Sequence, residues 1–274
     1  MNLIEAMQRE FSASKQLYSR FVFPLGGALY LVALLSSLDL SDGLFVALAI
    51  ATFGIQIAVF VLRILADQHY GNGEQIRRLV MMEDGLGVAP TSLDIASIQE
   101  RISGRLNKEA PHTTPYYASQ REKGDARLLE TIEESGFFTS GLARRSWKFF
   151  AGIAALGVLI SLLIIALFFL APYPTTFARV GATFILASMT FWAAGDFALI
   201  AYRFFNLHRE VSEIIGHCDR ALSANNQTQM HSEAICEFSR YNVALAQAAA
   251  PIPNWLYRRY RDMLNGAWAS RKES

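Results

Sequence analysis

The stretch FVFPLGGALYLVALLSSLDL, residues 21–40, is followed after two residues by GLFVALAIATFGIQIAVFVLRIL, residues 43–65. Two further apolar runs occupy residues 149–171 and 177–204. A helix rises about 1.5 Å per residue, so each run is long enough to cross a hydrocarbon core of roughly 30 Å. The sequence therefore predicts an all-α, polytopic membrane protein with four transmembrane helices arranged as two pairs.

The basic residues are unevenly distributed around these runs. The connectors 41–43 and 172–175 contain neither Lys nor Arg, and only Arg179 is basic near that side of the membrane. The other basic residues lie before the first run, in residues 63–148, and after Tyr202. By the positive-inside rule, these regions and both chain termini are expected in the cytoplasm.

This orientation predicts a division of the chain into five parts. They are an N-terminal cytoplasmic helix (1–20), transmembrane helices 1 and 2 (21–65), a cytoplasmic helical segment (66–148), transmembrane helices 3 and 4 (149–204) and a cytoplasmic helical tail (205–274). A seam of apolar residues at steps of three or four continues the last run into the tail: Leu207, Val211, Ile214, Cys218 and Leu222. We expect the central segment and the tail to form one helical cytoplasmic domain.

The composition and motifs argue against several classes of protein. A net charge of +1 is not typical of a protein that binds a nucleic acid polymer. Glycine-rich phosphate loops, nucleophile elbows, HExxH and CxxC motifs do not occur in the sequence, so we expect neither an enzyme nor a cofactor. Four soft ligands, His217, Cys218, His231 and Cys236, lack the closely spaced pairs of a zinc site, and we expect no metal.

Two polar residues interrupt the apolar runs. Asp196 lies in the fourth run and Gln56 near the middle of the second. A polar group in a membrane is costly and is often functional, so both are candidates for lining a path through the membrane. The alternatives are a static contact between helices or, for Asp196, solvation at the interface.

Arginines in the central segment are candidates for binding an anionic ligand, because guanidinium recognises phosphate through paired hydrogen bonds. The candidates are Arg77, Arg78, Arg121 and Arg127. They serve equally well as topology signals or as salt-bridge partners.

Two further features concern partners. Small residues four apart, such as Gly54 and Ala58, allow helices to approach closely in lipid, either within a bundle or in a homo-oligomer, although ordinary membrane composition also produces them.

A helix after Asn254 carries Trp255, Arg258, Arg259 and Arg261. It can lie on the anionic inner leaflet or dock on the cytoplasmic domain with its arginines in water.

The layout resembles the bacterial four-TM effectors associated with SMODS nucleotidyltransferases. The similar stretches are Gln8-Arg9 with Tyr18, the block 116–139, and Ala249-Ala250-Pro251-Ile252-Pro253 with Tyr257 and Leu264-Asn265. The resemblance implies an antiphage role in the bacterial inner membrane. In that role a cyclic nucleotide made by a partner enzyme triggers the membrane protein to permeabilise the bilayer.

The sequence thus favours an inner-membrane effector that is gated by a cytoplasmic nucleotide signal or partner and acts by membrane disruption or pore formation. The alternatives are a non-catalytic membrane scaffold that recruits a cytoplasmic partner, and a small channel or transporter resting mostly on Asp196.

Overall fold

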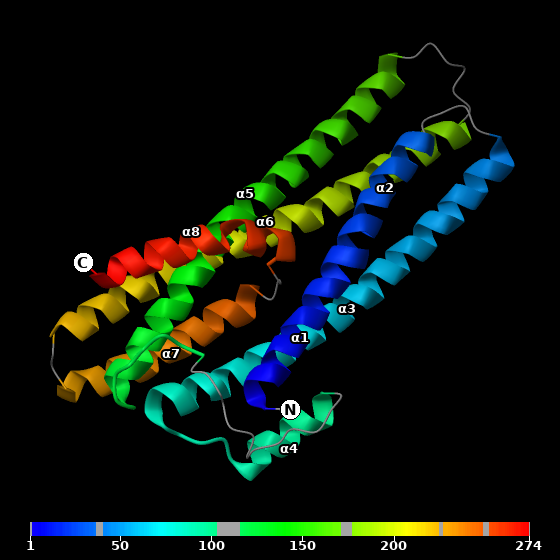
Figure 1. The fold of residues 1–274 in the computed structure, drawn as a ribbon. Helices are drawn as coiled ribbons and strands as arrows, with labels where there is room; N and C mark the ends of the chain where they lie inside the picture. The colour runs from blue at the N-terminus through cyan, green and yellow to red at the C-terminus, as the bar shows by residue number, and fades with distance from the viewer. Residues whose placement is uncertain are drawn as a thin grey trace. The chain divides into compact units, whose positions relative to one another are not determined.

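The computed structural model describes residues 2–36, 41–102, 116–170, 177–224, 227–248 and 252–273. All regular structure in these ranges is helical, which confirms the predicted all-α class (Figure 1). The ends of the first and third apolar runs (37–40 and 171) and the connector 172–175 lie outside the described residues. The elements are α1 (Leu3–Leu17), a π-helical turn (Tyr18–Val22), α2 (Phe23–Ser36), α3 (Asp42–Leu86), α4 (Ser92–Arg101), α5 (Asp125–Leu170), α6 (Phe177–Ala224), α7 (Gln227–Ala248) and α8 (Asn254–Glu273).

Three of these helices are much longer than a membrane crossing requires. Helices α3, α5 and α6 contain 45, 46 and 48 residues. Each combines one apolar run with polar sequence that continues it, and for α6 the apolar seam after the fourth run predicts this continuation. Helix α3 ends at Leu86, where Gly87 adopts a φ of +76°, a left-handed conformation that glycine accepts without strain.

A proline explains the π-helical turn between α1 and α2. Pro24 has no N–H and its ring crowds the carbonyl of residue 20, which disfavours a regular α-helix there. In the wider turn, the N–H of Phe23 donates to the carbonyl of Tyr18 instead. The chain therefore stays helical through Pro24.

The chain divides into two compact units. The polar unit comprises Met1–Lys15, Ala66–Ser146 and Arg203–Ser274, and the apolar unit comprises Gln16–Leu65 and Trp147–Tyr202. Helices α3, α5 and α6 therefore contribute residues to both units.

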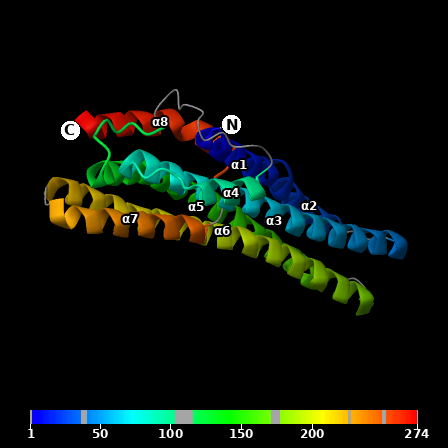
Figure 2. The same cartoon turned by 90° about the horizontal axis from the view of Figure 1, so that it is seen from below.

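The polar unit is built around a conventional buried core. The predicted seam on α6 is confirmed for Leu207, Val211, Ile214 and Cys218, all of which are buried. Helix α7 returns beside the last part of α6 (Figure 2), where Arg240 forms an ion pair with Glu213 and the Nδ1 of His217 lies 3.2 Å from the Glu237 carboxylate.

The apolar unit has a small core and an apolar surface. Phe23, Phe150 and Phe197, from α2, α5 and α6, pack with ring centroids 5.4–6.3 Å apart. Most other large apolar side chains that the structure describes in this unit are exposed, including Ile50 (69%), Phe53 (61%) and Phe60 (64%).

Among the described residues, two helices are long and apolar enough to cross a membrane: Val46–Leu86 within α3 and Asp125–Leu163 within α5. Only 6% of the most apolar window of the first is buried, and 28% of that of the second. The core helix of a soluble protein would instead be largely buried. The four membrane crossings and the orientation stay predictions.

Candidate functional site

The four candidate arginines belong to the polar unit, and the structure separates them by their partners. Each nitrogen of the Arg77 guanidinium, on α3, contacts another side chain. Its Nε donates to the Glu74 carboxylate at 2.8 Å, its Nη1 lies 2.9 Å from the Met81 sulfur, and its Nη2 donates to the Asn242 amide oxygen at 3.1 Å. Both Arg77 and Glu74 are buried. These contacts engage three of the five N–H groups of Arg77 and hold the buried guanidinium in place, so its role is structural.

A buried tyrosine extends this arrangement to a third helix. The Arg77 guanidinium lies 4.8 Å from the ring centroid of Tyr241, a cation–π distance. The Tyr241 hydroxyl lies 2.9 Å from the hydroxyls of both Ser135 and Thr139 on α5. These contacts tie α3, α5 and α7 together.

Arg127 is likewise satisfied within the chain. Its guanidinium contacts both carboxylate oxygens of Asp84, the closer at 2.8 Å, and donates to the carbonyl of Arg121 at 2.6 Å. Arg121 itself is half exposed and lies 3.6 Å from Glu130, a loose surface ion pair. Neither arginine has the geometry of a prepared ligand site.

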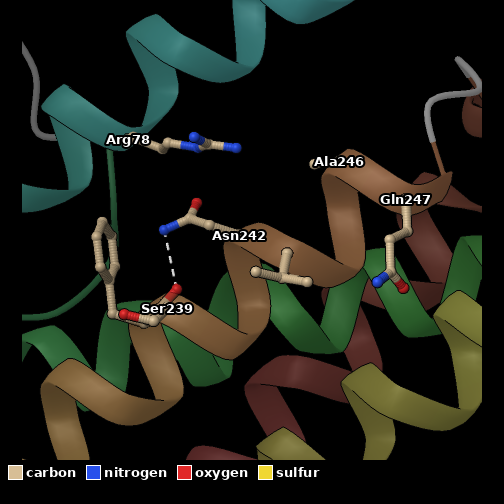
Figure 3. A pocket seen from close by; sticks show the side chains of 7 residues that line it. Arg78, Ser239, Asn242, Ala246 and Gln247 are labelled. Carbon is tan, nitrogen blue, oxygen red and sulfur yellow. Dashed lines mark hydrogen bonds between the residues drawn. The ribbon is translucent and has the colours of Figure 1, made fainter.

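Arg78 is the exception. Its Nε is buried, and no residue in the described part of the chain forms a hydrogen bond or an ion pair with its guanidinium. The side chain extends from α3 toward Asn242 and Ala246 of α7 (Figure 3). It lines a groove of about 510 Å³ together with Phe238, Ser239, Asn242, Val243, Ala246 and Gln247.

A second hollow of about 420 Å³ adjoins the first and shares Arg78 and Ala246 with it. It is lined also by Asp67, Tyr70, Gly71, Glu74, Gln75 and Arg101. The carboxylate of Glu74 is already engaged by Arg77, and Arg101 donates to Gln75 at 3.0 Å. Arg78 therefore lies where the two hollows meet.

The groove has the chemistry of a site for an anion that carries flat rings. A guanidinium without a partner in the described part of the chain, next to amide and hydroxyl side chains, suits phosphate or carboxylate oxygens. Phe238 lines one hollow and Tyr70 the other, where the Tyr70 ring also packs edge-on against Phe11 with centroids 5.7 Å apart. Aromatic rings of this kind can stack on a planar group. The Nε of Arg78 is buried without a hydrogen-bond partner among the described residues, which is costly for the free protein, and an anion there would recover part of that cost.

A tyrosine at position 117 lies close to the same arrangement. Its hydroxyl is buried and forms no hydrogen bond within the described residues. Burial raises the pKa of Tyr117 well above its ordinary value, although the charge of Arg77 acts in the opposite direction. The phenol therefore stays protonated over the physiological range.

The two polar residues of the apolar runs differ in their surroundings. The carboxylate of Asp196 on α6 lies 3.1 Å from the guanidinium of Arg63 on α3, and the side chain of Asp196 is 56% exposed. This ion pair joins two helices of the apolar unit, which favours the contact interpretation over a path-lining role. Gln56 is half-buried on α3.

Sequence reasoning selected Arg78 as one of four equivalent candidates and missed the residues of α7 that face it. Ser239, Asn242, Ala246 and Gln247 recur at helical spacing, which gives α7 a small and polar stripe. Such a stripe indicates a helix face that leaves room for a groove, but which helix lies opposite it depends on the tertiary fold. Among the soft ligands, Cys218 is buried, while His217 and His231 pair with Glu237 and Asp125.

No family model, curated protein or solved structure matches this chain.

Proposed function

We propose that this chain is a membrane effector of bacterial antiphage defence. In this proposal the groove at Arg78 binds a nucleotide signal made in the cytoplasm, and the apolar helices respond by permeabilising the inner membrane. The observation that carries the proposal is an arginine without a partner among the described residues, in a groove between two helices.

A nucleotide is the ligand class that uses the whole groove. Its phosphate would pair with Arg78, and its base would stack on Phe238 or Tyr70. The two hollows meet at Arg78, so a ligand with two bases around a central phosphate, such as a cyclic dinucleotide, would occupy both.

Helix α3 provides a physical route from the groove to the membrane. Arg78 lies 13 residues after Leu65, where the second apolar run ends, and both residues belong to α3. This separation is about 20 Å along the helix axis. A ligand that links α3 to α7 would restrain or shift α3, and small helix shifts of this kind are a common form of switching.

The exposed apolar surface supports the membrane half of the proposal. It fits helices that contact lipid or further copies of the chain, and a pore or a disrupted bilayer requires contacts of one of these kinds. We propose a homo-oligomer as the active form.

A binding measurement on the purified full-length chain tests the ligand. We expect a member of a panel of cyclic dinucleotides and trinucleotides to bind, and Arg78→Gln to weaken binding roughly 10- to 100-fold through loss of a charged hydrogen-bond donor. Arg220→Gln, which removes an exposed arginine of α6, is the matched control and should bind as the wild type does. Equal affinity of the Arg78→Gln and wild-type proteins would contradict the proposed site.

A further inference from the structure

Helix α8 is attached to the polar unit through one face. Leu256, Leu264 and Trp268 are buried, and the first two form a core cluster with Leu142 of α5. The Trp268 ring packs against Phe137, with centroids 5.3 Å apart. This apolar face fixes which side of α8 points away from the protein.

The opposite face combines basic and aromatic side chains. Trp255, Arg258 and Arg259 follow the spacing of one helical face, and all three are exposed. No carboxylate in the described ranges forms an ion pair with Arg258 or Arg259, although Arg259 also lies 5.9 Å from the Tyr260 ring. Asp262 shares this face and pairs with Arg261 at 3.3 Å. The face therefore keeps an excess of positive charge next to an exposed tryptophan.

Two cation–π contacts join the first half of α8 to other segments of the polar unit. Lys15 lies 5.4 Å from the ring centroid of Tyr257, and the guanidinium of Arg145 lies 4.5 Å from that of Tyr260. Lys15 precedes the first apolar run at Phe21 by six residues, and Arg145 precedes the third run at Phe149 by four. In a helix these separations are about 9 Å and 6 Å.

The first half of α8 thus contacts two cations of the polar unit, Lys15 and Arg145, that precede apolar runs by only a few residues in the sequence. Tryptophan is enriched where a protein meets the headgroup region, and clustered arginines at that level attract anionic lipids. A helix with one apolar and one cationic face can pack on the protein core through the first and contact lipid headgroups through the second.

We infer that the face of α8 formed by Trp255, Arg258 and Arg259 binds the anionic phospholipid headgroups of the membrane that holds this protein. The inference rests on the membrane-spanning role proposed above for the apolar helices, and it adds the lipid class that the polar unit recognises. Headgroup contact would restrain α8, and through Lys15 and Arg145 it would restrain α1 and α5 as well.

A fluorescent label on the outer face of α8 tests this inference in the full-length protein. Asn265 is exposed on that face, so the variant Asn265→Cys/Cys236→Ser can be labelled while Cys218 stays buried. The labelled protein is placed in nanodiscs of phosphatidylcholine with or without phosphatidylglycerol. Quenching by nitroxides attached to the lipid headgroups reports how closely the label approaches the surface.

We expect strong quenching with phosphatidylglycerol and weak quenching without it, because the attraction requires anionic lipid. Arg258→Gln/Arg259→Gln should lower the ratio of docked to undocked helix roughly 25-fold at low salt, about fivefold for each arginine. Raising the salt concentration should have the same direction of effect in the wild type.

A second double variant, Lys123→Gln/Arg220→Gln, is the matched control because it removes two exposed cations from elsewhere in the polar unit. It should keep the response to phosphatidylglycerol. Thermal unfolding of the variants checks that they fold, which is expected since all four side chains are exposed.

Quenching that is equal in the two lipid mixtures, or unchanged in Arg258→Gln/Arg259→Gln, would overturn the lipid inference and leave the proposed nucleotide gating in place. A chain that an alkaline wash releases from membranes would overturn both, because no segment would then span the bilayer.

Discussion

The polar unit and the apolar unit differ in whether their apolar side chains are buried or exposed. Among the described residues, 31 of the 38 buried apolar residues belong to the polar unit, while 18 of the 27 exposed large ones belong to the apolar unit. Burial from water drives the packing of the polar unit. The apolar unit leaves such side chains on its surface, which is stable only where lipid or another apolar surface covers them.

A second contrast separates two neighbours on α3. Arg77 is buried and uses its donors on Glu74, Met81 and Asn242, whereas Arg78 has no partner in the described part of the chain. Adjacent positions on a helix point about 100° apart, so one side chain enters the core and the other faces the groove. Each prediction below tests one of these two contrasts.

The largest effect is expected for Arg77→Met, which leaves the buried Glu74 carboxylate without its partner. Removing one member of a buried ion pair costs about 3–5 kcal/mol in unfolding free energy, and the thermal unfolding midpoint of the purified protein should fall accordingly. Arg78→Met should lower the midpoint little. The double variant Arg77→Met/Glu74→Met should recover most of the loss, and a failure to recover would mean that the ion pair is not what holds this region together.

A charge placed on the surface of the apolar unit is expected to have the next largest effect. Phe53→Arg exposes a guanidinium near the middle of the second apolar run and should cost about 3 kcal/mol of insertion free energy. Leu93→Arg is the matched change in the polar unit, at a side chain that is 79% exposed, and should be nearly neutral. The fraction of protein that stays in membranes after alkaline extraction measures both. Equal retention of the two variants in membranes would contradict the expectation that the apolar unit, and not the polar unit, presents its surface to lipid.

Glycine substitutions probe packing in the two units. A Cβ at Gly85 would lie 3.0 Å from the backbone of Leu128 at the start of α5. Gly85→Ala should therefore lower the unfolding free energy by about 1–3 kcal/mol. Gly54→Ala meets nothing within 4 Å among the described residues and should be neutral in a monomer. If Gly54→Ala instead weakens assembly in detergent, as judged by size-exclusion chromatography with light scattering, the stripe of small residues contacts another copy.

The smallest effect concerns thiol reactivity. Burial raises the pKa of Cys218, so little thiolate forms there, whereas Cys236 is exposed. At pH 8 a maleimide should modify Cys236 alone, and both thiols once the protein is denatured. Mass spectrometry of the labelled protein counts the adducts, and rapid modification of Cys218 in the native state would mean that the α6 seam opens.

The elements of this fold follow from short-range patterns. The apolar seam from Leu207 to Cys218 predicts that α6 continues past its apolar run, because a helix brings residues three and four apart onto one face. The helix cap at Thr91 is also local, since its hydroxyl accepts from the N–H of Asp94, three residues later. Such features need no knowledge of distant contacts.

The roles of the arginines depend on contacts that the sequence does not reveal. Arg77 meets Asn242 from 165 positions away, and Arg127 meets Asp84 from 43 positions away. No local pattern distinguishes these two paired arginines from Arg78. Helix α8 is an intermediate case, because its pattern left docking and membrane contact as alternatives, and the structure buries Leu256 and Leu264 while Arg258 and Arg259 stay exposed.

Membrane integrity in living bacteria tests the central claim most directly. The full-length chain is expressed with and without a cyclic-nucleotide-producing partner, and loss of membrane potential and dye uptake are followed for the wild type, Arg78→Gln and Arg220→Gln. We predict leakage that requires the partner in the wild type and Arg220→Gln and is lost in Arg78→Gln. Leakage independent of the partner, or equal in Arg78→Gln and the wild type, would contradict gating through this groove, and intact membranes in every case would contradict an effector role.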